Sequence, residues 1–138
     1  MTWLAYAFIS AIAAALTAIL AKRGIENVPA TLATAIRTIV IAVFAWVMVL
    51  GLGQQSALGS VPRRSWVYLI LSGLTTGISW LAYFRALQLG PASRVAPIDK
   101  LSLPITVVLA VVLLGETLSW KIALGITLMT VGALLTLI

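Results

Sequence analysis

The chain alternates long apolar segments with short polar or glycine- and proline-containing segments. An α-helix rises 1.5 Å per residue, so about 20 apolar residues cross the hydrocarbon core of a bilayer. The pattern therefore predicts an all-α fold, a bundle of five transmembrane helices forming one domain over residues 1–138. The predicted spans are residues 3–21, 31–52, 66–87, 94–114 and 120–138.

The segments between these spans carry ordinary helix-ending residues. The first span is closed by residues 22–24 (Lys-Arg-Gly), the second by residues 51–53 (Gly-Leu-Gly) and the fourth by Gly115, while Gly90 and Pro91 separate the third from the fourth. A polar loop is expected between the second and third spans, over residues 54–64. Five crossings would place the two termini on opposite faces of the membrane. Aromatic residues typical of membrane interfaces stand near span beginnings, at Trp3, Trp66, Tyr68 and Trp120.

Composition strengthens the membrane prediction. Hydrophobic residues make up 62% of the chain and charged residues 9%, whereas an average soluble domain carries roughly 25% charge. A soluble chain this short could not bury so much apolar surface. The net charge of +6 is explained by Lys and Arg beside the helices, so no nucleic-acid partner is expected. Residues 1–3 carry no basic group, so the first apolar stretch is interpreted as a span and not as a cleaved signal peptide.

The residue types that are missing narrow the chemistry. The chain has no Cys and no His, which excludes disulfides, Cys or His metal ligation, and Ser-His or Cys-His catalysis. It also lacks a nucleotide-binding glycine loop and the common hydrolase motifs. Its acids, Glu26, Asp99 and Glu116, are too far apart in sequence to form a local carboxylate pair. We expect no enzyme activity, no cofactor and no metal.

Two spans reach full length only by taking charge into the membrane. The uninterrupted apolar run of residues 39–52 would cover only about 21 Å, so the second span must include Arg37. The run of residues 101–114 has the same length, so the fourth span must include Asp99 and Lys100. We predict that Arg37 pairs with Asp99, with Lys100 or Lys22 as the alternative partner.

Ionisable groups inside a membrane are functional candidates, because each costs about 2.5–3.5 kcal/mol when unpaired at mid-helix. The alternative is structural. The Arg and Lys side chains would then reach the headgroups, and Asp99 would cap a helix.

Three spans carry polar side chains that repeat at helical spacing. At about 100° per residue, each set falls on one face within about 60°. We interpret these stripes as the lining of a path for a polar solute, although hydrogen bonds between helices would produce the same pattern. The stripe residues are Tyr6, Ser10 and Thr17 in the first span, Ser72, Thr76, Ser79 and Tyr83 in the third, and Asp99, Ser102 and Thr106 in the fourth.

Small residues and prolines mark packing and bending. Gly73 and Gly77 form a GxxxG pair in the third span, and residues 125 and 132 are glycines seven positions apart in the fifth. Such glycines let helices approach closely, so both pairs predict helix-packing seams. Pro97 and Pro104 predict a bend or a partial break in the fourth span, and broken helices often border transport sites.

One part of the chain is also similar to a known family. Residues 83–87 (YFRAL) and 90–97 (GPASRVAP) resemble the EamA-type domain of the drug/metabolite transporter superfamily, and residues 98–102 (IDKLS) resemble its short, five-span bacterial and archaeal branch. Residues 114–116 (LGE), with the later glycines, resemble the end of that domain. Residues 16–22 and 33–38 also fit it.

The resemblance implies a secondary transporter of a small metabolite or drug-like solute, located in the cytoplasmic (inner) membrane of a bacterium or archaeon. Many relatives carry two five-span halves inverted against each other, so a single half is expected to pair with a second copy or a related half. Smaller four-span relatives use a buried Glu in the first span as a proton site, and this chain has no acid there.

An antiparallel homodimer requires a weak Lys/Arg bias between the two faces. Three basic residues are predicted on the N-terminal face and four on the other, so dual topology is allowed. Counting the two submerged residues, Arg37 and Lys100, makes it three against six and favours one orientation. The face sets are Arg63, Arg64 and Lys121 against Lys22, Arg23, Arg85 and Arg94.

Three functions remain open at this point. The favoured one is a dimeric transporter in which Arg37, Asp99 and Lys100 set the charge preference toward anionic or zwitterionic solutes. The second is a membrane interaction subunit that transports nothing. The third is a carrier of lipids or lipid-linked sugars.

Overall fold

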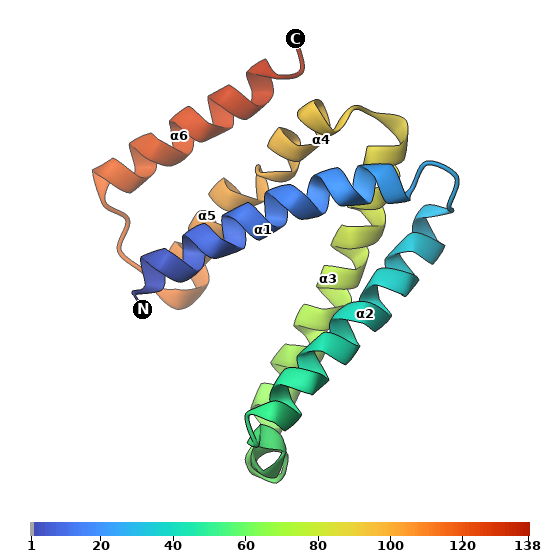
Figure 1. Cartoon of the computed structure of the whole chain (residues 1–138). Helices are drawn as coiled ribbons and strands as arrows, with labels where there is room; N and C mark the ends of the chain where they lie inside the picture. Colours follow the sequence, from blue (N-terminus) through green and yellow to red (C-terminus); the bar gives the residue numbers. More distant parts are fainter. Residues whose placement is uncertain (1) are drawn as a thin grey trace. The chain divides into compact units, whose positions relative to one another are not determined.

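The computed structural model describes residues 2–138, and within them it is helical and contains no strand (Figure 1). This confirms the all-α class. The count of helices was wrong, because the described chain has six α-helices where five were expected. The helices are α1 (Trp3–Gly24), α2 (Ala30–Gly51), the 3₁₀ helix η1 (Gln54–Ser60), α3 (Arg63–Leu89), α4 (Ala92–Asp99), α5 (Ser102–Leu114) and α6 (Trp120–Leu135).

Four helical segments are long and apolar enough to cross a membrane. They are α1, α2, α3 and the combined segment Ala92–Leu114, which contains α4 and α5. The last predicted span is shorter than expected, since α6 has 16 residues and ends at Leu135. A helix of that length rises about 24 Å, less than the hydrocarbon thickness of about 30 Å. Four candidate crossings and one shorter apolar helix are therefore what the described chain contains.

Glycines end two of the helices where the sequence predicted an end. Gly53, two residues beyond α2, has φ 67°, and Gly115 at the end of α5 has φ 70°. Both values lie in the left-handed region that glycine adopts without a Cβ penalty. The turn at Gly115 lets the Glu116 N–H donate to the Ala110 carbonyl at 3.3 Å, which satisfies one of the last carbonyls of α5.

The predicted loop over residues 54–64 is more ordered than expected. It contains η1, and α3 begins at Arg63 instead of Trp66. The apolar pattern placed the boundary at the first apolar residue, but a helix continues into the headgroup region, where Arg side chains are tolerated. For the same reason α1 extends through Lys22 and Arg23 to Gly24.

The fourth predicted span is broken at residues 100–101, between α4 and α5. The Lys100 carbonyl accepts from the Leu103 N–H at 2.9 Å, and Leu101 N–H donates to the Ile98 carbonyl at 3.0 Å, so the backbone tightens into a 3₁₀-type turn. Pro104 has no N–H to offer the Lys100 carbonyl four residues earlier, and its ring excludes that carbonyl from the helical position. The predicted partial break is confirmed.

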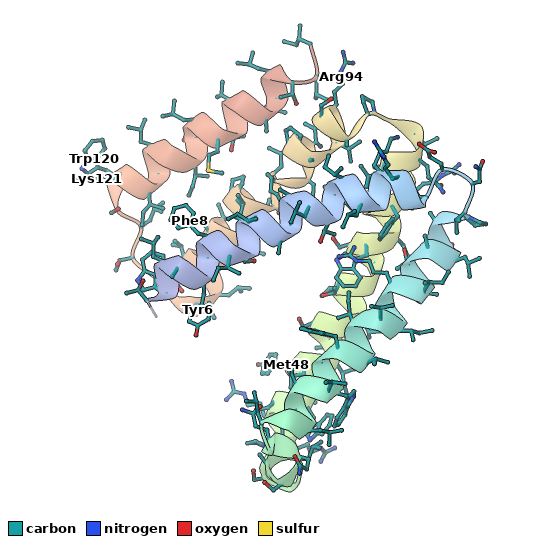
Figure 2. The ribbon with its side chains drawn as sticks, viewed as in Figure 1. Tyr6, Phe8, Met48, Arg94, Trp120 and Lys121 are labelled. Atoms are coloured by element: carbon teal, nitrogen blue, oxygen red, sulfur yellow. The ribbon has the colours of Figure 1, made fainter. Side chains whose placement is uncertain are left out.

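The chain forms two compact units. The terminal unit comprises residues 1–19 and 89–138, which hold most of α1 together with α4, α5 and α6. In it, α6 packs against both α4 and α5, and Ala133 of α6 is buried. Figure 2 shows Trp120 and Lys121 at the start of α6, and Tyr6 and Phe8 projecting to different sides of α1.

The hairpin unit comprises residues 20–88, which hold the end of α1, then α2, η1 and nearly all of α3. Figure 1 shows α2 and α3 as the two arms of a hairpin that η1 joins. The buried residues of this unit are Ile25, Thr34, Phe84 and Leu87. They come from the α1–α2 connection, the start of α2 and the end of α3, so the interior lies at the end of the hairpin away from η1.

Two polar contacts hold that end together. The Lys22 ammonium donates to the Leu87 carbonyl, one of the carbonyls left without a helical partner at the end of α3. The Gln88 amide donates to the Val28 carbonyl in the α1–α2 connection at 2.7 Å. Both bonds join the end of α3 to chain that is more than 50 residues earlier, so they fix how the hairpin closes.

The glycine pairs do not form packing seams inside the described chain. A Cβ built on Gly73, Gly77, Gly125 or Gly132 would meet no neighbouring atom within 4 Å. The predicted close approach of helices at these glycines is therefore not found within residues 2–138.

Candidate functional site

Arg37 lies inside α2, seven residues after the helix begins at Ala30. That places its Cα about 10 Å along a helix of about 33 Å, which is long and apolar enough to cross a membrane. One turn earlier, Thr34 is buried, and its hydroxyl donates to the Ala30 carbonyl at 2.8 Å. The Thr38 hydroxyl donates in the same way to the Thr34 carbonyl. The two hydroxyls on this part of α2 thus bond within their own helix, and Arg37 is the charged residue between them.

The Arg37 guanidinium lies against aromatic rings of α3. Its central carbon is 4.3 Å from the centroid of the Trp80 ring and 5.4 Å from that of Phe84. Tyr83 meets Phe84 edge to face, with ring centroids 6.4 Å apart and an interplanar angle of 72°. Phe84 is only 2% exposed. These four residues, Arg37, Trp80, Tyr83 and Phe84, are called the Arg37 cluster below.

The spacing of the aromatic residues explains why two rings meet one guanidinium. Trp80 and Phe84 are four residues apart on α3, and residues at that spacing lie on the same face of a helix. Buried Phe84 and Leu87 turn this part of α3 toward the interior of the hairpin unit, which brings the ring pair to α2. The polar pattern of the sequence indicated Tyr83 but not Trp80 or Phe84. The signal available was two rings at helical spacing in a span whose neighbour carries an Arg.

No anionic or carbonyl group engages Arg37 within the described chain. Within residues 2–138 the Arg37 side chain makes no ion pair and donates no hydrogen bond. A cation–π contact contributes roughly 0.5–2 kcal/mol, depending on how dry the site is. That offsets only part of the insertion cost of about 2.5–3.5 kcal/mol for a mid-membrane Arg. The in-plane N–H groups therefore need water or an anion.

A second charged site lies at the helix break of the terminal unit. The Lys100 ammonium is 3.3 Å from the Asp99 carboxylate, and the two side chains are 54% and 35% exposed. Asp99 ends α4 and Ser102 begins α5, so the constant angular step assumed for Asp99, Ser102 and Thr106 does not run across the break. The predicted stripe in this span is thus split, with Asp99 and its ion pair before the break and Ser102 and Thr106 after it.

The structure tests part of the predicted pairing among these charged residues. Asp99 is paired with Lys100, one of the two alternatives, and Lys22 donates to the Leu87 carbonyl. Arg37 belongs to the hairpin unit and Asp99 to the terminal unit. An Arg37–Asp99 pair stays a prediction.

The threonine hydroxyls of the stripes bond within their own helices. Thr76 donates to the Ser72 carbonyl and Thr106 to the Ser102 carbonyl, each at 2.8 Å. These two bonds are the local kind that Ser and Thr make when no other partner competes. They do not join two helices. The alternative explanation of the stripes, hydrogen bonds between helices, is therefore not found for these two threonines. The solute-path role of the stripe residues stays a prediction.

Comparison with known proteins identifies the family. The model of the EamA-like transporter family matches residues 1–138. This chain belongs to the EamA-like transporter family. A Sinorhizobium sp. protein named "Uncharacterized transporter in cobO 3'region" is 47% identical over 134 residues, covering 97% of this chain and 95% of that protein. No solved structure matches the chain.

Family membership confirms the resemblance found in the sequence. With several apolar helices, it makes the chain a multi-pass membrane protein of a transporter family. The similar protein is named a transporter, which points to transport rather than catalysis. Within residues 2–138, the Arg37 cluster and the helix break are the two places where a charged residue of a candidate span lies seven or more residues from both ends of that span.

Proposed function

We propose that this chain is one half of a dimeric secondary transporter that moves a small polar metabolite or drug-like solute across the cytoplasmic membrane of a bacterium or archaeon. The observation that carries the proposal is the break between α4 and α5, with an ion pair of Asp99 and Lys100 beside it. The family supports the transport role.

The break supports a wet site because of its depth. It begins eight residues into the segment Ala92–Leu114, about 12 Å along a segment of about 34 Å. The ion pair of Asp99 and Lys100 lies at that depth, and ionisable groups inside a membrane almost always face the protein interior or a water-filled cavity. Interrupted helices border the substrate in many secondary transporters.

Two observations support pairing with a second copy or a related half. The glycines of α3 and α6 meet no neighbour within the described chain, and small residues in membrane helices mark the places where another helix approaches. The similar Sinorhizobium sp. protein, which is named a transporter, has nearly the same length as this chain. A protein of this size thus carries the transporter name as a single short chain.

Thiol accessibility tests the solute path. The chain has no native Cys, so single substitutions Ser72→Cys, Thr76→Cys and Ser79→Cys report without background. A membrane-impermeant maleimide should label these positions on α3 and leave Leu74→Cys unlabelled, because Leu74 lies on the opposite face of the same helix. Equal protection of all four thiols would favour the interaction subunit.

Flux is the direct test. Proteoliposomes holding the full chain and loaded with a bacterial metabolite extract should lose specific solutes faster than empty liposomes, as measured by mass spectrometry. Arg37→Leu should abolish that loss while the protein still inserts. Protein-dependent flux that survives Arg37→Leu would remove Arg37 from the path, and the absence of any flux would reject transport by this chain alone.

The pairing is tested by the glycines. Gly77→Leu in α3 should weaken a crosslinked dimer band in membranes, because the larger side chain holds two helices apart. Gly59→Leu in η1 is the matched control, since Gly59 also has open space around it but lies outside the candidate spans. A dimer band that is unchanged in Gly77→Leu would place the interface elsewhere.

A further inference from the structure

We infer that the Arg37 cluster binds the carboxylate of an organic monoanion that has an apolar body. The inference rests on the proposed transport function and names the class of solute recognised there. It starts from the juxtaposition of one intramembrane guanidinium with the rings of Trp80 and Phe84.

The rings leave the hydrogen-bonding edge of the guanidinium available. A guanidinium on an aromatic ring uses its face for that contact, and its five N–H groups lie in the plane. At 4.3 Å from the Trp80 centroid, Arg37 is close enough to be held by that ring. Two parallel N–H groups in a fixed plane match the two oxygens of a carboxylate. The rings therefore hold the guanidinium in place and leave its paired N–H groups to donate hydrogen bonds to a ligand.

The surrounding charge favours a single negative charge on the ligand. Within the hairpin unit, the Lys22 ammonium is engaged by the Leu87 carbonyl, and Arg85 donates to the Gln88 side chain at 3.2 Å. Arg37 is the cation of this unit that lies well inside a candidate span. One fixed positive charge neutralises a carboxylate, whereas a phosphate group carries about −1.5 to −2 at neutral pH. A phosphate would keep uncompensated charge in the membrane.

The rings also provide the surface for an apolar body. Phe84 is buried beneath the guanidinium, while Trp80 and Tyr83 are partly exposed on the same stretch of α3. Aromatic faces bind apolar and planar groups through dispersion and ring quadrupole interactions. A ligand with its carboxylate on Arg37 would place its adjoining carbon atoms against these two rings.

Binding is measured on the full chain in lipid nanodiscs by equilibrium dialysis with radiolabelled benzoate. We expect saturable binding that unlabelled benzoate and hexanoate displace, and that benzamide and inorganic phosphate do not. Benzamide has the same ring and nearly the same shape as benzoate but no charge, so it isolates the carboxylate. Displacement by phosphate at equal concentration, or equal displacement by benzamide, would overturn the inference.

Variants of the cluster assign the binding to Arg37. Arg37→Gln should weaken benzoate binding at least 30-fold, and Arg37→Lys at least 5-fold, because Lys keeps the charge but lacks the planar fork. Trp80→Leu should weaken binding several-fold by releasing the guanidinium. Arg64→Gln is the matched control, because Arg64 also lies over a ring, that of Tyr68 at 5.7 Å, but in the first turn of α3.

The outcomes separate this inference from the transport proposal. Benzoate binding that is unchanged in Arg37→Gln and Arg37→Lys would reject the inference, even if metabolite flux in proteoliposomes persists. Carboxylate binding lost in Arg37→Gln and kept in Arg64→Gln, with no flux of any solute, would support the site and reject transport. Arg37→Lys also covers the case in which Arg37→Gln does not fold, since it retains the cation over the rings.

Discussion

Replacing Pro104 by Ala should close the break between α4 and α5. Pro104 is the third residue of α5, and it lacks the N–H that would bond the Lys100 carbonyl. Pro in a helix interior costs about 3 kcal/mol relative to Ala. The 3₁₀-type bonds at Leu101 and Leu103 would be exchanged for α-helical ones, a change of small net free energy.

The continuous helix should therefore gain about 2–3 kcal/mol over the broken one, a shift of roughly 30- to 150-fold in the ratio of the two conformers. Closing the break would also move Asp99 and Lys100 onto one regular helix and remove the irregular backbone beside their ion pair. If that backbone borders the solute path, flux in proteoliposomes should fall at least tenfold while the protein becomes more stable.

Spin-label distances measure the change in shape. Labels on Val95→Cys and Leu109→Cys flank the break, and in a continuous helix their backbones would be about 21 Å apart. Pro104→Ala should give a narrower distance distribution centred near the straight-helix value. Pro91→Ala is the control, because Pro91 precedes α4, where a missing N–H removes no helical bond. A distribution identical to that of the unsubstituted chain would refute the assignment of the break to Pro104.

Two stability predictions concern the closed end of the hairpin unit, both read as the unfolding midpoint in mixed micelles. Lys22→Met removes the donor to the Leu87 carbonyl and should destabilise the fold by about 1 kcal/mol, whereas Lys121→Met at the exposed start of α6 should change it little. An equal effect of the two substitutions would refute the capping role. Phe84→Ala should lower the free energy of unfolding by about 2 kcal/mol. The loss is mainly one of packing, because lipid is as apolar as the protein interior. Phe8→Ala, at a side chain that is 64% exposed, should lower it by less than about 0.5 kcal/mol. A smaller loss for Phe84 than for Phe8 would contradict the burial seen here.

The sequence alone determined the helices that are long and apolar, because crossing length depends only on the rise per residue and the run of apolar side chains. It also placed Arg37 inside a candidate span and predicted the break near Pro104, since both follow from local chain chemistry. The family could be recognised from residues 83–102, because that stretch carries specific residue types and not only apolar character.

Tertiary structure decided which groups meet. In a membrane segment nearly every residue is apolar, so the hydrophobic pattern does not tell which face of α3 packs on α2. That is why Trp80 and Phe84 were not predicted as neighbours of Arg37. Asp99 pairs with Lys100, the next residue in the chain, at the point where α4 ends. Sequence thus fixes how much charge enters the membrane, while packing fixes what that charge contacts.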